Sequence, residues 1–478
     1  MKKQPNMILF MPETLRADAV FGLAERRART PVLDELAKQS VTFQNTFVNH
    51  SVCTPSRCSM FTGFYPHTCG HRTLDYLLKP YENNLFRDLK ENGYTTVCFG
   101  KNDILSPESV SKSFDSIELL VWPDTPSAEN PWPEDHKFYK TFYYGERPAK
   151  YSKDYDWACI ESALKFLDNP PEPFCLFLPL SFVHPPYYVE EPYFSMHDRS
   201  KVPKPIRPEH EGRRRYARLM YERYGLKNLE EKDFREIKAT YFGMVSRIDQ
   251  MLGLVLDRLK QTKLFDKTAI VVFSDHGDYT GDYGLVEKWW TGFEEPIIHT
   301  PLIIRVPGQE VSINRNCLIE MVDLYPTILN IAGVKPSHYY FGKSVLPLLD
   351  ADHPDVHRNA VFCEGGHNPD ERHCREPLLE NIYYEKTHLP EYDPVVISKA
   401  IMVRTGRYKY IYCPDEHDEL YDLQADPDEL RNLVSQEQLI GIAAELKSEI
   451  LEWLTRTADT VPLEKDPRKF QRTRKLNL

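Results

Sequence analysis

The sequence contains no long uninterrupted apolar run. The longest, from Phe174 to Val183, has about ten residues and includes Pro179, whereas a helix that crosses a bilayer needs roughly 18 or more. Near the N-terminus a short apolar stretch is interrupted by Pro12 and Glu13, so the pattern of a secretion signal is missing. We therefore expect no membrane span, no membrane partner and a cytoplasmic location.

Regular cysteine spacing and an excess of positive charge are also missing. The 10 cysteines form no spaced framework, so we expect reduced thiols. The net charge of −11 argues against a broad electrostatic contact with nucleic acid. What is present is a chain of 478 residues, 41% hydrophobic and 27% charged, which is typical of a folded enzyme with a large core. An anionic substrate would need a local cluster of cations.

Polar residues follow several apolar, strand-length runs at the point where each run ends. The runs span residues 6–11, 94–99, 174–178 and 268–273. They lead, in that order, into Glu13 and Thr14, Lys101, His184, and Asp275 and His276. In open α/β sheets ligands bind at the carboxyl ends of the strands, so we expect these side chains to meet in one site.

Helical periodicity lies between these runs, most clearly over residues 231–260. Alternating strands and helices predict an α/β fold with a mostly parallel sheet. From residue 351 onward the pattern changes to short apolar patches and one further helix at 437–456. We therefore predict two domains: residues 1–350 carry the site, and residues 351–478 form a smaller α+β subdomain with an antiparallel sheet, a helix and a basic tail.

The most specific element of the sequence is Cys53-Thr54-Pro55-Ser56-Arg57. A Thr-Gly pair at 62–63 and a Pro-His pair at 66–67 follow it closely. This pattern resembles the signature of the sulfatases, in which the cysteine is oxidised after translation to formylglycine by a transiently bound maturating enzyme. Similar segments lie at residues 15–18, 93–101, 274–288 and 419–427. The resemblance implies an alkaline-phosphatase-like fold, in which helices enclose a large mixed, mostly parallel sheet and a smaller subdomain is appended.

The resemblance also implies a divalent metal site. Its ligands here would come from Glu13, Thr14, Cys53, Asp275 and His276. The chain has Glu13-Thr14 where many members carry paired aspartates, and Asp275-His276 where Asp-Asn is common. The second form resembles phosphonate monoester hydrolases, choline sulfatases and some carbohydrate sulfatases. Oxygen ligands favour Ca²⁺, while Mg²⁺ remains open and an imidazole admits Mn²⁺.

The catalytic side chains that the resemblance implies come from the same motifs. Arg57 would orient the modified residue, while Lys101 and Lys288 would contact the charged ester oxygens. His184 is similar to the histidine that protonates the leaving group, so we assign it the role of general acid. Asp103 stands where a histidine is usual, and either replaces it as the base on formylglycine or has lost that role.

The expected cycle uses both hydroxyls of the hydrated aldehyde at position 53. One hydroxyl attacks sulfur, and the alcohol leaves with a proton from His184. Deprotonation of the second hydroxyl then expels sulfate and restores the aldehyde. A serine at position 53 lacks that second hydroxyl, so it would be trapped as a sulfate ester.

The leading hypothesis is hydrolysis of a small carbohydrate-derived or aryl sulfate monoester. A phosphonate monoester or phosphate diester hydrolase is the alternative, because the same nucleophile and metal serve phosphorus. A third reading is an inactive sulfate-ester binding protein. Aromatic residues that follow the motifs either stack on the substrate or pack in the core: Tyr187, Tyr188, Trp289 and Trp290. Whether the protein forms a homo-oligomer stays open.

Overall fold

A computed structural model describes residues 4–22, 27–118, 129–207 and 210–463. Its main sheet has eight strands: β1 (Asn6–Pro12), β2 (Val41–Phe47), β3 (Thr95–Phe99), β4 (Ser116–Glu118), β6 (Phe174–Leu180), β8 (Thr268–Phe273), β9 (His299–Arg305) and β10 (Ile313–Glu320). They lie in the order β10-β2-β9-β8-β1-β6-β3-β4, and only β9 is antiparallel to its neighbours. The predicted mostly parallel sheet is confirmed.

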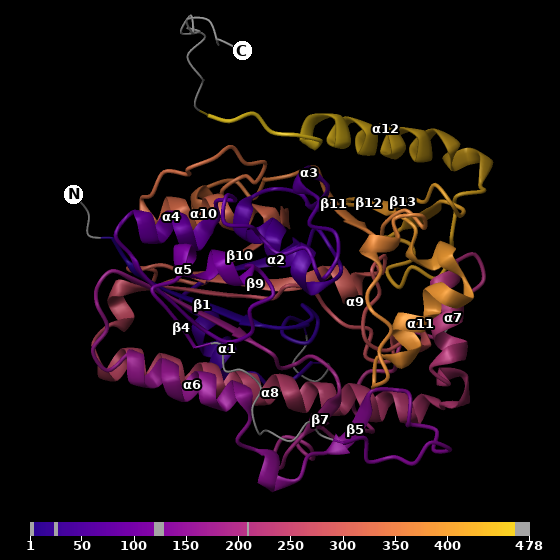
Figure 1. Ribbon diagram of the computed structural model, residues 1–478, viewed down its shortest axis with the longest axis horizontal. Helices are drawn as coiled ribbons and strands as arrows, with labels where there is room; N and C mark the ends of the chain where they lie inside the picture. The colour runs from indigo at the N-terminus through magenta and orange to yellow at the C-terminus, as the bar shows by residue number, and fades with distance from the viewer. Residues whose placement is uncertain (1–3, 23–26, 119–128, 208–209, 464–478) are drawn as a thin grey trace, which may run out of the picture.

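Helices cover both faces of this sheet. The α-helices of the described residues are α1 (Pro31–Ala37), α2 (Cys53–Thr62), α3 (Pro66–Cys69), α4 (Leu85–Glu91), α5 (Val110–Ser113), α6 (Tyr155–Phe166), α7 (Arg215–Arg223), α8 (Glu231–Gln261), α9 (Glu295–Ile298), α10 (Leu324–Ala332), α11 (Tyr384–Tyr392) and α12 (Ile440–Thr457). In Figure 1, α6 and α8 lie along one side of the sheet, and α2, α4 and α10 lie along the other. The central strands β1, β6 and β8 are buried throughout, which explains their continuous apolar sequence.

The C-terminal region forms a second, smaller sheet. Its strands β11 (Ala360–Gly365), β12 (Ala400–Thr405), β13 (Tyr408–Tyr412) and β14 (Glu419–Asp422) pair in sequence order and are all antiparallel. Helix α12 packs on this sheet through Leu446 and Ile450. The predicted antiparallel C-terminal sheet is therefore confirmed. A domain border at residue 350 stays a prediction, and the basic residues Lys465 to Lys475 lie outside the described residues.

Two short strands, β5 (Tyr143–Glu146) and β7 (Tyr187–Val189), pair beyond the main sheet. They pack against α8 on the side where β6 ends. Among the described residues, no helix combines the length and the apolar composition that crossing a membrane requires.

Candidate active site

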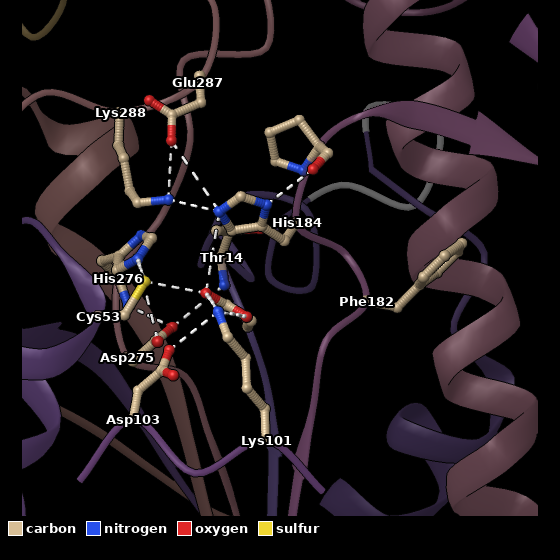
Figure 2. A network of polar contacts seen from close by, with 12 residues as sticks. Thr14, Cys53, Lys101, Asp103, Phe182, His184, Asp275, His276, Glu287 and Lys288 are labelled. Carbon is tan, nitrogen blue, oxygen red and sulfur yellow. Dashed lines mark hydrogen bonds and ion pairs between the residues drawn. The ribbon is translucent and has the colours of Figure 1, made fainter. Parts of the chain in front are cut away.

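The strand order brings the sequence motifs together. β1 pairs with β6 on one side and with β8 on the other, in parallel on both, so the carboxyl ends of these strands meet at one edge. Glu13 and Thr14 follow β1, Asp275 follows β8, and His184 follows β6. Figure 2 shows Asp275, His276 and His184 gathered near Cys53, the first residue of α2.

Cys53 lies in the middle of this cluster and is buried. Its Sγ is 2.9 Å from Glu13 Oε1 and 3.3 Å from His276 Nε2. Burial, and then the Glu13 carboxylate, raise the pKa of the Cys53 thiol well above its ordinary value. The unmodified thiol is therefore a poor source of thiolate. Its position is nevertheless suited to a nucleophile, because polar side chains surround it.

Arg57, one helical turn after Cys53, joins the two carboxylates of the site. Its Nε donates to Asp275 Oδ2 over 2.9 Å, and its Nη2 is 3.5 Å from Glu13 Oε2. Its Nη1 is 3.6 Å from Asp103 Oδ2. Because Arg57 is completely buried, its guanidinium fixes the position of three acidic groups and neutralises part of their charge.

Lys101 reaches the cluster from the end of β3. Its Nζ is 3.1 and 3.2 Å from the two Glu13 oxygens and 2.9 Å from Asp103 Oδ2. Gly100 makes this approach feasible: it has φ +150°, and a Cβ there would lie 2.3 Å from the Pro179 carbonyl oxygen. The Asp103 carboxylate thus pairs with Lys101 and Arg57, and its predicted role as base on the residue at position 53 stays a prediction.

The donor set fits a divalent cation. Glu13, Cys53, Asp275 and His276 offer ligand atoms that all lie within 4.8 Å of one another. Thr14 adds a hydroxyl oxygen that is buried and has no hydrogen-bond partner in the described structure. Hard oxygen donors beside one imidazole match the ligands that Ca²⁺, Mg²⁺ or Mn²⁺ accept.

His276 is oriented to serve as a ligand. Its Nδ1 lies 2.8 Å from the Gly277 carbonyl oxygen and donates to it, so Nε2 carries the free lone pair and faces Cys53. Burial is the main reason that the pKa of His276 is lowered to about 4. The imidazole is neutral at physiological pH, the form that binds metals.

His184 forms a close pair with Lys288. His184 Nε2 lies 2.6 Å from Lys288 Nζ, and His184 Nδ1 lies 2.7 Å from the Pro185 carbonyl oxygen. An ammonium group can only donate, so Nε2 accepts from Lys288 and Nδ1 carries the proton. Burial, and then the Lys288 charge, lower the pKa of His184 to about 3. The histidine is therefore neutral with Nε2 as an acceptor, and a general-acid role requires Nε2 to gain a proton before the leaving group departs.

Three further residues of the site carry little or no signal in the sequence. Glu287 is completely buried and lies 2.8 Å from Lys288 Nζ; its only signal was its adjacency to Lys288. Lys386 in α11 donates to both Glu287 oxygens. Tyr383, just before α11, places its hydroxyl 3.5 Å from His184 Nδ1. These two come from the C-terminal region, where no catalytic motif was apparent.

A cavity of about 450 Å³ opens beside Glu13, Lys101 and His184. Its outer wall is largely aromatic and polar: Tyr144, Arg147, Tyr155, Phe182, Tyr188, Asn381 and Tyr383. Of the four aromatic residues singled out in the sequence, Tyr188 lines this cavity. Tyr187 instead donates its hydroxyl to Asp278, and Trp289 is packed in the core.

The whole chain can be compared with known proteins. The family description "Sulfatase" matches residues 5–334. The chain belongs to the sulfatase family. A second description, the C-terminal part of N-sulphoglucosamine sulphohydrolase, matches residues 371–456. The resemblance stated from the motifs is thereby confirmed, and the protein is a sulfatase-family hydrolase.

Individual members of the family are similar along nearly all of this chain. Arylsulfatase K of Danio rerio is 25% identical over 468 residues, which cover 91% of this chain and 81% of the relative. The phosphonate monoester hydrolase of Agrobacterium radiobacter superposes with a TM-score of 0.77 at 23% identity, covering 95% and 96% of the two chains. A 2-O GAG sulfatase gives 0.72 at 21% identity, covering 95% and 93%. The alkaline-phosphatase-like fold is confirmed.

Proposed function

We propose that this sulfatase-family protein hydrolyses a small sulfate monoester of a carbohydrate-derived or aryl alcohol, with formylglycine made from Cys53 as its nucleophile. The observation that carries the proposal is the position of Cys53: buried at the start of α2, in contact with Glu13 and His276, and beside an aromatic cavity. The hydrated aldehyde supplies the hydroxyl that attacks sulfur. The unmodified thiol is a poor nucleophile here, because its pKa is raised.

The cations of the site would hold the ester anion. Lys101 and Lys288 approach Cys53 from different directions, as Figure 2 shows, and both are within reach of a group bound there. Burial alone would raise the pKa of Glu13, but the positive charges of Lys101 and Arg57 help to hold it well below its ordinary value. Glu13 therefore stays ionised and keeps these cations in place without a bound substrate.

A divalent cation held by Glu13, Asp275, His276 and the residue at position 53, with Thr14 beside them, would neutralise charge on the ester oxygens. We propose Ca²⁺, with Mg²⁺ and Mn²⁺ as the alternatives. Arg57 orients Asp275 for this role, because its Nε occupies one carboxylate oxygen while the backbone N–H groups of Thr14 and His276 donate to the other.

The leaving group would receive its proton from His184. Nε2 accepts from the Lys288 ammonium group in the structure, and burial and the Lys288 charge keep it unprotonated there. We propose that a bound ester anion draws the Lys288 N–H groups to its own oxygens and adds negative charge beside the ring, so that Nε2 takes up a proton from solvent. Nε2 then passes this proton to the departing alcohol, while Lys288 keeps its charge.

The cavity supports a small, ring-shaped alcohol. Phe182 faces it from the β6–β7 connection, Tyr188 faces it from β7, and Tyr383 faces it from the C-terminal region. Aromatic walls of this kind stack on sugar or aryl rings. A volume of about 450 Å³ accommodates a monosaccharide or an aryl group and is small for a polymer. We also propose a cytoplasmic location and a transient maturating enzyme as partner.

The experiment that tests this function is a ratio of hydrolysis rates. Protein co-expressed with a sulfatase-maturating enzyme is given an aryl sulfate and an aryl phosphonate ester of the same phenol, with Cys53→Ala as control. We expect the sulfate to be hydrolysed faster. A ratio well below one would move the protein to the phosphonate monoester hydrolases, an alternative that Asp275-His276 favours.

Two further outcomes separate the remaining readings. If mass spectrometry finds formylglycine and neither ester is hydrolysed, the substrate must be a specific sugar sulfate that the aryl esters do not imitate. If Cys53 is unmodified in protein from its native host, the hydrolase mechanism fails and the binding-protein reading gains support.

A further inference from the structure

Glu287 lies between two buried lysines. Its Oε1 is 2.8 Å from Lys288 Nζ and 3.0 Å from Lys386 Nζ, and its Oε2 is 2.8 Å from Lys386 Nζ. The carboxylate is completely inaccessible, and both lysines are buried as well. Three ionised groups in contact away from water interact strongly, so their arrangement constrains where the Lys288 ammonium group can point.

The two lysines differ in how many oxygens of the Glu287 carboxylate they contact. Lys386 contacts both oxygens, whereas Lys288 contacts only Oε1 and donates a second N–H to His184 Nε2. Figure 2 shows Lys288 between Glu287 and His184, facing the cluster around Cys53. Glu287 has a left-handed backbone, with φ 62°. Such a conformation is unfavourable for a residue with a side chain and is found mainly where the surroundings enforce it.

The charges explain what Lys386 contributes. With Lys386 present, one carboxylate faces two ammonium groups, and the cluster carries a surplus positive charge next to the site. Without Lys386, Glu287 would pair with Lys288 alone, neutralise it and draw it away from His184. A neutral Glu287–Lys288 pair would attract an anion at the site far less.

We propose that Lys386 is a positioning residue for the reaction: by engaging the Glu287 carboxylate it keeps the Lys288 ammonium group free and directed at His184 and the bound anion. The inference rests on the proposed function only in that the anion is an ester sulfate or phosphonate. It gives the C-terminal region a part in the active site, because Lys386 belongs to α11, 98 residues after Lys288 along the chain and in contact with it through Glu287.

The test measures anion binding separately from turnover. Inorganic sulfate is titrated calorimetrically into the full-length, metal-loaded, formylglycine-containing protein, and kcat and KM are measured on the aryl ester that the wild type hydrolyses fastest. For Lys386→Met we expect sulfate binding to weaken about tenfold and KM to rise by a similar factor, because one nearby positive charge is neutralised. Lys386→Arg keeps the charge and should restore both values to within about threefold.

Lys140→Met is the matched control. Lys140 forms an ion pair with Glu385, the residue next to Lys386 in the same helix, and it is half-exposed. The substitution removes the same charge and a neighbouring ion pair without touching Glu287. Sulfate binding and KM should therefore stay within about twofold of the wild type, as is usual for an exposed pair.

Glu287→Gln provides an independent arm in case Lys386→Met does not fold. This variant removes the anchor of Lys288 but leaves both ammonium charges. We expect kcat to fall at least about tenfold while sulfate binds no more weakly than to the wild type. The opposite pattern, weaker sulfate binding with unchanged kcat, overturns the proposal.

The remaining outcomes are also decisive. If Lys386→Met folds, melts near the wild-type temperature and matches it in sulfate binding and KM, Lys386 has no positioning role. If Lys386→Arg loses as much as Lys386→Met, the role is one of packing. A wild type that hydrolyses neither ester, yet binds sulfate more tightly than Lys386→Met does, would narrow the substrate to a specific sugar sulfate and leave this inference standing. A wild type that binds neither sulfate nor phosphate would refute both.

Discussion

The two regions of the molecule contribute to the site in different ways. The main sheet delivers charged groups from the ends of neighbouring strands, within a few residues of an apolar run: Glu13 after β1, Lys101 after β3 and Asp275 after β8. The C-terminal region delivers Lys386 from α11 and Tyr383 from the residue before this helix, and both reach the site only in the folded protein.

This difference distinguishes residues that take part in the reaction from residues that position them or bind the substrate. The groups at the sheet edge surround Cys53 directly, so their loss should abolish the reaction. The groups from the C-terminal region touch His184 and Glu287, or line the cavity, so their loss should change affinity and orientation. The predictions below test that separation, from the largest expected effect to the smallest.

Cys53→Ser should eliminate sustained turnover. A serine hydroxyl can attack once, but it lacks the second hydroxyl that expels sulfate, so the covalent ester accumulates. We expect steady-state kcat to fall at least about a thousandfold, as is usual when a nucleophile is lost. Rapid mixing with an aryl sulfate should release no more than one equivalent of phenol. Multiple turnovers by this variant would exclude the proposed mechanism, and Cys58→Ser, a buried cysteine outside the donor set, serves as control.

Asp275→Asn should remove most of the bound metal. The Asp275 carboxylate belongs to the buried donor set and also receives Arg57 Nε. We expect the variant to lose metal affinity roughly 100-fold and activity with it. Metal content by mass spectrometry checks this, alongside Asp278→Asn, which alters a buried carboxylate outside the donor set whose Oδ1 accepts from the Tyr187 hydroxyl and the Thr280 backbone N–H. Equal metal content in both variants would show that Asp275 is no ligand.

The site residues at the carboxyl ends of the strands could be predicted from the sequence, whereas those that line the cavity from the C-terminal region could not. The reason is physical. Residues that follow a buried strand are placed by the strand itself, so Glu13, Lys101 and Asp275 were predictable from apolar runs and motif spacing. Lys386 and Tyr383 are placed by the packing of α11 against distant segments, which leaves no local pattern. The neutral state of His184 is a third case. It depends on burial and on the nearby Lys288 charge, which motif spacing does not encode.

Asp156 should make stability depend on pH. It lies in the first turn of α6 and accepts from the backbone N–H groups of Ser181 and Phe182 over 2.8 and 2.7 Å. Burial, and then Asp154, raise its pKa from the ordinary 3.8 to about 7. The folded state therefore holds a proton that the unfolded state has lost between these values, so stability falls as pH rises through this window and then levels off.

The expected size of this effect is about 2–3 kcal/mol in the free energy of unfolding between pH 5 and pH 8. Urea unfolding at several pH values measures it. Asp156→Asn should flatten the dependence, because the amide does not titrate, whereas the exposed Asp168→Asn should leave it unchanged. A dependence that persists unchanged in Asp156→Asn would assign it to other groups.

Tyr188→Ala and Tyr383→Ala should have the smallest effects, and they compare the two regions directly. Both rings line the cavity, Tyr188 from β7 with the Arg147 guanidinium 4.8 Å from its ring, and Tyr383 from the C-terminal region beside His184. If the cavity binds the organic part of the ester, each variant should raise KM about threefold to tenfold, the usual worth of an aromatic contact. Inhibition by inorganic sulfate should not change, because sulfate does not reach the outer wall. Because Tyr383 also approaches His184, a fall in kcat confined to Tyr383→Ala would place the C-terminal region closer to the chemistry than its position on the cavity wall alone requires.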